Sequence, residues 1–270
     1  MTDRYAVIGN PIAHSKSPEI HAAFARATGE DLEYTRILAP LDGFAAAVTA
    51  FRAAGGRGLN VTLPFKGEAF RLATEPSDRA RAVEAVNTLR FEGTRILGDT
   101  TDGVGLIRDL RVNLGVDLAG RRVLLVGAGG ASRSVMPALL EAGPAVIVVV
   151  NRTVERAAEL ARQFGERVRA AGFATLPRTP FDVVINGTSA GHAGELPPLE
   201  RAAFAEGALA YDMTYGRGAD TFLGLAREAG AARVADGLGM LVEQAAESFA
   251  IWRGLRPDTA PVLAMLRAAA

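Results

Sequence analysis

The feature that most constrains the fold lies mid-chain, where residues 123–133 read VLLVGAGGASR. An apolar run ends at a cluster of glycines, and a segment of helical composition follows. A strand that turns over glycines directly into a helix is typical of the phosphate-binding turn of dinucleotide-binding βαβ units. Gly127 permits the tight turn, and Gly129 lets backbone N–H groups approach a pyrophosphate at the helix N-terminus. Ser132 stands where a third glycine or alanine is usual, and an ordinary βα turn is the alternative interpretation.

The next apolar strand indicates which dinucleotide would bind. Residues 145–150, AVIVVV, are followed by Asn151, Arg152 and Thr153, with Arg156 one helical turn later. An NAD site would have an acidic residue here, which accepts hydrogen bonds from the ribose 2′-hydroxyl. Guanidinium groups instead suit a 2′-phosphate, through charge-assisted bidentate bonds. We therefore expect NADP rather than NAD; a solvated charge at a helix start is the alternative for each arginine.

Short β-branched runs alternate with longer alanine-rich segments along the chain, which predicts an α/β fold with mainly parallel strands. At 270 residues, of which 49% are hydrophobic, the chain suits one large or two smaller domains. We expect an N-terminal α/β domain over residues 1–102, a Rossmann-like domain over 103–237, and helices from residue 238 onward. A hairpin is expected to turn at Glu92–Gly93. Strands are expected at residues 4–10, 32–38, 57–63, 123–126, 145–150, 181–187, 208–213 and 232–236.

Composition excludes several classes of function. Lysine plus arginine equals aspartate plus glutamate at 30 each, which gives no electrostatic case for nucleic acid or an anionic membrane surface. The absence of cysteine removes disulfides, thiolate catalysis and zinc–thiolate sites, and the three histidines lack the spacing of a helical metal site. The N-terminus does not read as a signal peptide, and the longest apolar run, PAVIVVV, is too short to cross a bilayer. We expect a cytoplasmic protein without a bound metal.

A second loop that could hold a ligand lies within residues 7–24, VIGNPIAHSKSPEIHAAF. The first strand stops at a Gly-Asn-Pro turn, and His14, Ser15, Lys16 and Ser17 precede the next helix. A connector does not need that density of donors, so we expect the loop to hold an anion or a polar molecule. Ser17 suits the N-cap position, with proline as the first helical residue, and a helix N-terminus favours an anion. A capping serine without a ligand is the alternative, but it would explain only Ser17.

Polar residues also follow neighbouring strands of the first domain. NVTLPFK carries Asn60, Thr62 and Lys66, AVNTL places Asn87 in a segment otherwise fit for burial, and GDTTDG carries Asp102. Ligands of open parallel sheets gather beyond the carboxyl ends of the strands. A lone lysine is most often solvated, but a lysine that converges with an aspartate, two asparagines and several hydroxyls predicts a polar site.

These motifs together resemble the shikimate dehydrogenase family over nearly the whole chain. They occur in that family's order: GNPIAHSKSP, NVTLPFK, AVNTL, TDGVG, GAGGASR, NRT, INGTSAG, YDMTYG and ADGLGMLVEQAAESFAIWRG. The resemblance implies an oxidoreductase that reduces 3-dehydroshikimate with NADPH in the shikimate pathway of aromatic amino acid biosynthesis. It also implies that the first domain binds substrate, that the middle domain binds NADP, and that the helices over 238–270 pack back on the first domain. Assembly into a homodimer is left open.

The family's pattern implies a role for each matching position. Ser15 and Ser17 would hold the shikimate carboxylate, and Lys66 with Asp102 would be the catalytic pair, in which the lysine protonates the alkoxide formed by hydride delivery. The residues implied in substrate binding are Ser15, Ser17, Thr62, Lys66, Asn87, Asp102, Tyr215 and Gln244. Those implied in cofactor binding are Asp78, Gly127, Ala128, Gly129, Gly130, Ala131, Asn151, Arg152, Thr153, Arg156, Met213 and Gly237. For Asp78, a solvated acid at a helix start is an equal alternative.

The chain departs from the family's usual pattern in places, and two rival functions stay open. Thr100 replaces a usual asparagine, and Glu84 replaces a usual glycine. One rival is a paralogue that oxidises quinate as well as shikimate, often with NAD; the Asn151–Thr153 strand end argues against it. The other is a non-catalytic ligand-binding protein on the same fold, and the intact pair of Lys66 and Asp102 argues against that.

Overall fold

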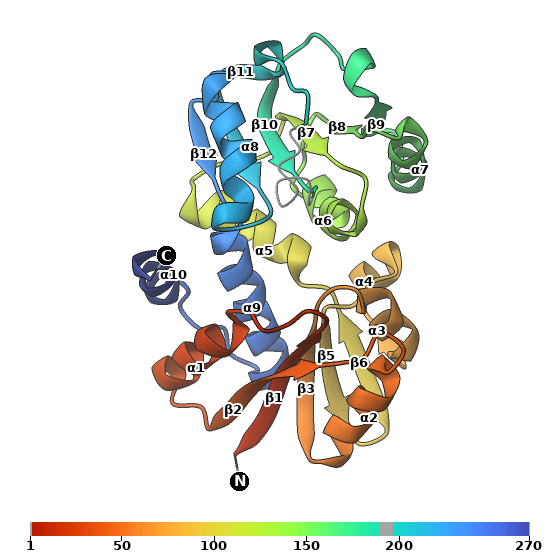
Figure 1. Ribbon diagram of the computed structural model, residues 1–270, viewed down its shortest axis with the longest axis vertical. Helices are drawn as coiled ribbons and strands as arrows, with labels where there is room; N and C mark the ends of the chain where they lie inside the picture. Colours follow the sequence, from red (N-terminus) through yellow and green to blue (C-terminus); the bar gives the residue numbers. More distant parts are fainter. Residues whose placement is uncertain (1, 189–196, 270) are drawn as a thin grey trace. The chain divides into compact units, whose positions relative to one another are not determined.

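The computed structural model describes residues 2–188 and 197–269, in which the chain forms two compact units (Figure 1). One unit comprises Met1–Gly105 with Val242–Ala270, and the other comprises Leu106–Leu241. The chain passes between them within α5 (Asp102–Arg108) and again within α9 (Leu238–Arg253). Over the described ranges each unit has its own six-stranded sheet, and no helix is long and apolar enough to cross a membrane.

The sheet of the first unit is mixed. Its strands are β1 (Asp3–Gly9), β2 (Leu32–Leu38), β3 (Gly56–Val61), β4 (Glu75–Pro76), β5 (Thr88–Glu92) and β6 (Arg95–Asp99), in the order β2-β1-β3-β5-β6-β4. β1 pairs in parallel with β2 and β3, and β4 pairs in parallel with β6. β3–β5 and β5–β6 are antiparallel. β5 and β6 form the expected hairpin, which turns through Gly93 at a φ of +55°.

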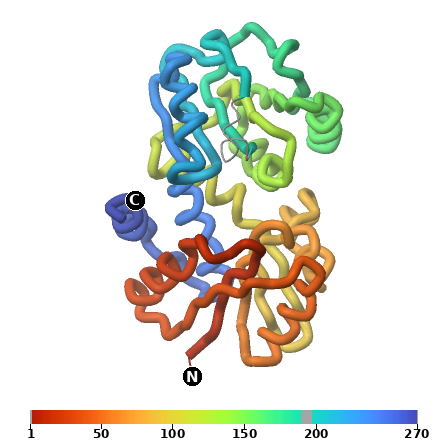
Figure 2. The backbone as a smooth tube through the Cα atoms, viewed as in Figure 1, coloured from red at the N-terminus to blue at the C-terminus, as the bar shows by residue number. Residues whose placement is uncertain are grey.

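Helices of the first unit bury apolar side chains against this sheet or against one another. They are α1 (Ser17–Thr28), α2 (Phe44–Ala53), α3 (Lys66–Leu72), α4 (Asp78–Val83), the later part of α9, and α10 (Ala260–Ala268). Ile8, Leu59 and Leu89 of the sheet pack with Phe44 and Phe65 in one core cluster. The end of the chain returns to this unit, where α10 packs against α1 (Figure 2).

The start of α1 differs from the prediction that Ser17 caps it. Lys16 occupies the N-cap position, and its side chain makes no cap hydrogen bond. Ser17 is instead the first helical residue, and its backbone N–H donates to Ser15 Oγ at 3.3 Å. The prediction was wrong by one residue because the side chain of Ser15 turns toward the backbone of Ser17, which a local capping pattern does not reveal.

The sheet of the second unit is entirely parallel, as expected of a Rossmann-like domain. Its strands are β7 (Arg122–Val126), β8 (Val146–Val150), β9 (Val168–Ala171), β10 (Phe181–Asn186), β11 (Phe204–Asp212) and β12 (Arg233–Ala235), in the order β12-β11-β10-β7-β8-β9. The sequence pattern did not predict β9. Its four residues are too few and too polar for a local signal, and its pairing with β8 creates it.

Helices cover both faces of this second sheet. They are α6 (Gly130–Glu141), α7 (Val154–Phe164) and α8 (Arg217–Glu228), and α5 continues into a π-helical turn over Asp109–Asn113. Leu125 of β7 packs in one core cluster with Leu139 of α6 and Leu160 of α7. Leu124, the preceding strand residue, packs in the other cluster with Phe222 of α8. Burial on both faces explains why the strands read as continuous apolar runs.

Candidate active site

In the first unit the strand order reverses at β1, and the loops that leave β1 and β3 meet there. The N–H of Asn10 donates to the carbonyl of Leu63 at 3.1 Å. A Cβ on Gly9 would lie only 2.4 Å from Cγ2 of Thr62, so glycine lets the two loops approach closely. Crevices at such switch points, beyond the carboxyl ends of strands, are where ligands bind in open α/β sheets.

The loop after β1 presents two serine hydroxyls close together. Ser15 Oγ donates to Ser17 Oγ at 3.2 Å; Ser17 is buried and Ser15 is half-buried. Arg36 of β2 holds this loop, because its Nε donates to the Ser15 carbonyl at 2.9 Å and its guanidinium pairs with Glu19 at 3.0 Å. Each hydroxyl can rotate to donate to an anion, so the pair suits a carboxylate. Thr62 is half-buried in the adjoining loop.

Lys66 and Asp102 form an ion pair across 36 positions of sequence. Lys66 is the first residue of α3, and Asp102 is the first residue of α5, shortly after β6 ends. Lys66 Nζ lies 2.6 Å from Asp102 Oδ2, and the side chains are 25% and 11% exposed. A lysine held at a carboxylate, yet still partly accessible, is placed to exchange a proton with a bound oxygen.

Asn87 contacts the same carboxylate from the strand side. Its amide nitrogen donates to Asp102 Oδ1 at 2.8 Å, and its amide oxygen accepts the N–H of Thr101 at 2.9 Å. Gln244 of α9 brings its side-chain oxygen to 3.3 Å from the same nitrogen. The structure thus gathers Lys66, Asn87, Asp102 and Gln244, four of the side chains that sequence analysis grouped.

Four residues beneath this cluster were missed as site candidates: Tyr34, Thr88, Thr101 and Ser248. Tyr34 Oη donates to Asn60 Oδ1 at 2.7 Å, and Asn60 Nδ2 donates to Ser248 Oγ at 2.9 Å. Thr88 Oγ1 lies 2.8 Å from Ser248 Oγ. The signal that could have found them is a polar side chain within an otherwise apolar strand or helix face. Thr88, in the AVNTL motif, is an example.

His21 and Tyr34 stack beside the serine loop. Their ring centroids lie 4.3 Å apart with an interplanar angle of 7°. Burial lowers the pKa of His21 to about 3, despite an opposing contribution from Asn60. Burial also raises the pKa of Tyr34 well above its usual value, and a hydrogen bond with Ser17 opposes that rise. Both groups are therefore neutral near pH 7 and add no charge next to the two serines.

Two further predicted residues are Asp78, implied near the cofactor, and Tyr215, implied at the border of the substrate. Asp78 begins α4 behind a Ser77 cap, and its exposed carboxylate pairs with Arg81 at 3.3 Å. That contact is the ordinary pair of a helix start. Tyr215 is half-buried after β11, in the second unit.

In the second unit the strand order reverses between β7 and β10, and the glycine-rich loop leaves β7 there. Gly127 has a φ of +99°, and a Cβ on it would lie 2.7 Å from Cγ2 of Thr188 in the loop after β10. A Cβ on Gly129 or Gly130 would meet no atom within 4 Å, so this part of the loop is open. An open turn at the N-terminus of α6 fits the pyrophosphate of a dinucleotide.

Asn151 ties the end of β8 to this loop. Its Oδ1 accepts the N–H of Ala128 at 3.3 Å, and its Nδ2 donates to the carbonyl of Thr153 at 2.8 Å. Arg152 and Arg156 are exposed next to it, Arg156 in the first turn of α7. Two guanidinium groups at this position fit the 2′-phosphate of NADP.

Ser132, at the usual place of a third glycine, is accommodated by Gly187, which directly follows β10. A Cβ on Gly187 would lie 2.5 Å from the buried Ser132 Oγ. Ala131 precedes it in the first turn of α6, where the Ala131 carbonyl accepts a hydrogen bond from Ser134 Oγ at 2.8 Å. The hydroxyl therefore occupies space that a side chain at position 187 would otherwise need.

Met213 and Gly237, both implied to border the cofactor, lie against each other. A Cβ on Gly237 would be 2.4 Å from the Met213 carbonyl oxygen. The N–H of Gly237 donates to the carbonyl of Thr214 at 2.7 Å, and the N–H of Met213 donates to the carbonyl of Asn186 at 2.9 Å. Position 237 therefore requires glycine, and Met213 is fixed at the carboxyl end of β10.

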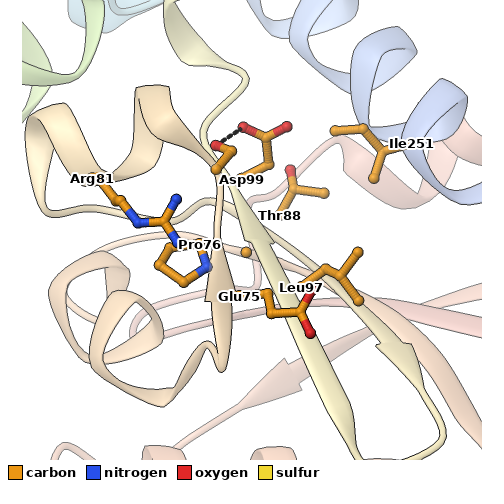
Figure 3. Close-up of a pocket in the computed structure, with 9 residues that line it drawn as sticks. Glu75, Pro76, Arg81, Thr88, Leu97, Asp99 and Ile251 are labelled. Atoms are coloured by element: carbon orange, nitrogen blue, oxygen red, sulfur yellow. Dashed lines mark hydrogen bonds between the residues drawn. The ribbon is translucent and has the colours of Figure 1, made fainter.

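A cavity of about 370 Å³ lies on the first unit at the β4–β6 edge of its sheet and reaches Thr88 (Figure 3). It is lined by Glu75, Pro76, Ser77, Arg81, Thr88, Leu97, Gly98, Asp99 and Ile251, none of which was predicted as a site residue. Ser77 Oγ donates to Asp99 Oδ1 at 2.6 Å within it.

Within residues 2–188 and 197–269, no group of His, Asp and Glu is arranged to hold a metal. His192 and the end of the INGTSAG motif lie outside the described residues.

Three segments of the chain match known family descriptions. Residues 7–89 match the shikimate dehydrogenase substrate binding domain. Residues 110–196 match shikimate/quinate 5-dehydrogenase, and residues 237–267 match the shikimate 5′-dehydrogenase C-terminal domain.

Individual proteins are similar over nearly their full length. A shikimate dehydrogenase (NADP(+)) from Nitrosospira multiformis is 58% identical over 269 residues, which cover 99% of this chain and 98% of that protein. The crystal structure of an Ael1 enzyme from Pseudomonas putida has a TM-score of 0.94 at 51% identity and 98% coverage of both chains. That of shikimate 5-dehydrogenase from Thermus thermophilus, in complex with NADP(H) and shikimate, has a TM-score of 0.85 at 34% identity, with 100% of both chains covered.

Proposed function

Because the chain belongs to the shikimate dehydrogenase family, we propose that it interconverts 3-dehydroshikimate and shikimate with NADP(H) in the shikimate pathway. It is an oxidoreductase of aromatic amino acid biosynthesis. The observation that carries the proposal is the ion pair of Lys66 and Asp102 at 2.6 Å, in which Asn87 also donates a hydrogen bond to the carboxylate. A protein that only binds a ligand has no need of such a proton-transfer pair.

The substrate is proposed to lie across the loops after β1, β3 and β6. Ser15 and Ser17 would donate to its carboxylate, which the paired hydroxyls and the neutral His21 and Tyr34 support. Its ring hydroxyls would meet Thr62, Asn87, Asp102 and Gln244, with Tyr215 at its border. A rigid buried cluster suits this task, because it holds donors and acceptors in place before the ligand arrives.

The cofactor is proposed to lie on the second unit. Gly127, Ala128, Gly129, Gly130 and Ala131 would hold its pyrophosphate, with Asn151, Arg152, Thr153 and Arg156 at the phosphorylated ribose, Met213 and Gly237 at the nicotinamide, and Asp78 near the cofactor. The open glycine turn and the two exposed arginines support this placement. When bound, the reduced nicotinamide supplies the hydride that the ketone carbon receives.

Lys66 is the proposed proton donor in the direction of reduction. As the ketone carbon gains hydride, its oxygen becomes an alkoxide, and the ammonium of Lys66 transfers one proton to that oxygen. Asp102 holds the ammonium in place and accepts a hydrogen bond from a substrate hydroxyl. In the direction of oxidation Lys66 takes the proton back, so the reaction consumes or releases one proton overall.

Further expectations from the sequence belong to the same proposal. Each part of the chain is proposed to bind one ligand: residues 1–102 and 238–270 bind substrate, and residues 103–237 bind NADP. A cytoplasmic location and a homodimer are also proposed; cell fractionation and light scattering of the purified protein would test them.

One assay separates this function from its rivals. Purified protein would be mixed with shikimate or quinate and with NADP+ or NAD+, and the absorbance of reduced nicotinamide would be followed. We expect turnover with shikimate and NADP+ and far less with either quinate or NAD+. Quinate is included because the matched family description names both acids. Comparable rates with quinate or NAD+ would favour the relaxed paralogue, and binding without turnover would favour the non-catalytic protein.

A further inference from the structure

Three buried polar residues beneath the active site depend on one another for their hydrogen bonds. Asn60 of β3 and Thr88 of β5 are directly paired across antiparallel strands, so their side chains share a face of the sheet. Ser248 of α9 contacts both, at 2.9 Å and 2.8 Å. Thr88 is 1% exposed and Ser248 is 0% exposed, so these hydroxyls need partners within the protein.

Tyr34 determines which atoms donate and which accept among these three residues. Its hydroxyl donates to Asn60 Oδ1 at 2.7 Å, so the amide nitrogen of Asn60 faces Thr88 Oγ1 at 3.2 Å and Ser248 Oγ at 2.9 Å. Because Thr88 Oγ1 accepts that bond, its own hydrogen points away from Asn60. With Ser248 Oγ as the donor in its 2.8 Å contact with Thr88 Oγ1, the Thr88 hydrogen is directed to Asn87 Oδ1, at 2.9 Å.

The side-chain amide of Asn87 consequently has one favourable orientation. The backbone N–H of Thr101, which can only donate, lies 2.9 Å from Asn87 Oδ1, the same atom that receives the Thr88 hydrogen. The NH₂ group must therefore face Asp102 Oδ1, at 2.8 Å. A rotated amide would put an oxygen against the carboxylate and an NH₂ against an N–H donor, and both contacts are repulsive.

We propose that Thr88 is a positioning residue for the reaction and acts through Asn87 on the carboxylate of Asp102. The proposal rests on the proposed function, in which Asp102 holds Lys66 for proton transfer. One carboxylate oxygen is held by Asn87 and the other by Lys66, so rotation of the Asn87 amide would release the carboxylate and with it the ammonium. Removing the Thr88 hydroxyl takes away one of three donors to Asn87 Oδ1; the other two are the N–H of Thr101 and, at 3.2 Å, its hydroxyl.

Two substitutions at position 88 and a control at an exposed threonine test the role. Thr88→Val keeps the shape of the side chain and loses the hydroxyl, whereas Thr88→Ser restores it. Thr74→Val is the control, because Thr74 Oγ1 accepts the N–H of Ile96 at 2.8 Å in the same unit but touches none of the site residues. Each protein would be assayed with shikimate and NADP+ at a temperature where circular dichroism shows it folded.

We expect Thr88→Val to lower kcat by about tenfold or more, with a smaller change in KM, because the hydroxyl acts on proton transfer. Thr88→Ser should keep kcat within about threefold of wild type, and Thr74→Val should change thermal stability but not kcat. A purely structural role predicts that Thr88→Val lowers stability and, like Thr74→Val, leaves kcat unchanged. That result, or an equal loss of kcat in Thr88→Ser, would overturn the proposal.

A second variant covers the case in which Thr88→Val does not fold. Ser248→Ala removes a contact of both Asn60 and Thr88, and alanine suits the interior of α9. We expect it to lower kcat by about threefold or more. An unchanged kcat would count against the proposal that Thr88 acts through Asn87 on Asp102. A wild-type protein inactive with shikimate and NADP+ would overturn the proposed function itself; an active wild type with an unimpaired Thr88→Val variant overturns only the positioning role.

Discussion

The ammonium of Lys66 lies 2.6 Å from the carboxylate of Asp102, and each of the two residues is the first of a helix. Both helices start near a strand end, where backbone hydrogen bonds fix the Cα positions. The chain therefore needs little side-chain reorganisation to present the pair to a ligand.

Lys66→Ala should lower turnover by on the order of a hundredfold or more while shikimate binding stays within about tenfold. The physical reason is the loss of the group that protonates the alkoxide. Steady-state kinetics and calorimetric titration with shikimate would measure the two effects. Arg71→Ala, an exposed residue of the same helix, is the control and should match wild type. Near-normal turnover in Lys66→Ala would remove the proton-donor role.

Arg152→Ala should weaken the binding of NADP+ far more than the binding of NAD+. The lost charge-assisted contact should cost about 1.5–3 kcal/mol of binding free energy. The ratio of kcat/KM for the two cofactors would report it. Arg162→Ala, in the last turn of α7 and also exposed, is the control and should leave the ratio unchanged. An equal loss for both cofactors would show that Arg152 does not contact the 2′-phosphate.

Ser15→Ala and Ser17→Ala should each raise the KM for shikimate. The expected rise corresponds to a loss of about 1–2 kcal/mol of binding free energy. The methyl ester of shikimate, which lacks the carboxylate charge, should bind wild type poorly and lose little more in either variant. If both variants weaken the ester as much as shikimate, the loop shapes the domain and the anion is held elsewhere.

The same two variants should differ in stability. Ser15 Oγ accepts the N–H of Ser17 at the start of α1, whereas the Ser17 side chain makes no cap bond. Ser15→Ala should therefore cost about 0.5–1 kcal/mol through the helix start, and any loss in Ser17→Ala must come from its buried hydroxyl. Urea unfolding of each variant would measure the difference.

His21 should make the fold less stable in acid. Its pKa is near 6.5 in the unfolded chain, whereas burial lowers it to about 3 in the fold. Between these values the unfolded chain binds more protons, so stability falls as pH drops below about 6.5, by at most about 1.4 kcal/mol per pH unit. His21→Phe, which keeps an aromatic ring against Tyr34, should flatten this slope between about pH 7 and about pH 5 in urea unfolding. An unchanged slope would show that other groups set the acid sensitivity.

Local signals in the sequence were enough for many elements of the fold. The strand, glycines and helix around Gly127 predict the dinucleotide turn, because only a glycine adopts its φ of +99° comfortably beside Thr188. The β5–β6 hairpin is predicted by the Glu92–Gly93 turn for a similar reason. Such features depend on a few neighbouring residues, so a pattern can find them. The Ser17 cap was also a local prediction, and it was wrong by one residue because the helix begins at Ser17 itself and Ser15 accepts the N–H of Ser17.

What the sequence alone determined is therefore the set of motifs: the dinucleotide turn, the arginines after β8, the serine loop, and the residue types at positions 66, 87 and 102. Tertiary structure decided how these residues are oriented. Asn60, Thr88 and Ser248 meet only because β3 pairs with β5 and α9 returns to the first unit, contacts that span up to 188 positions. Hydrogen bonds between such distant residues depend on register and helix placement, which no local window of sequence encodes. The orientation of Asn87, and with it the hold on Asp102, belongs to the folded chain as a whole.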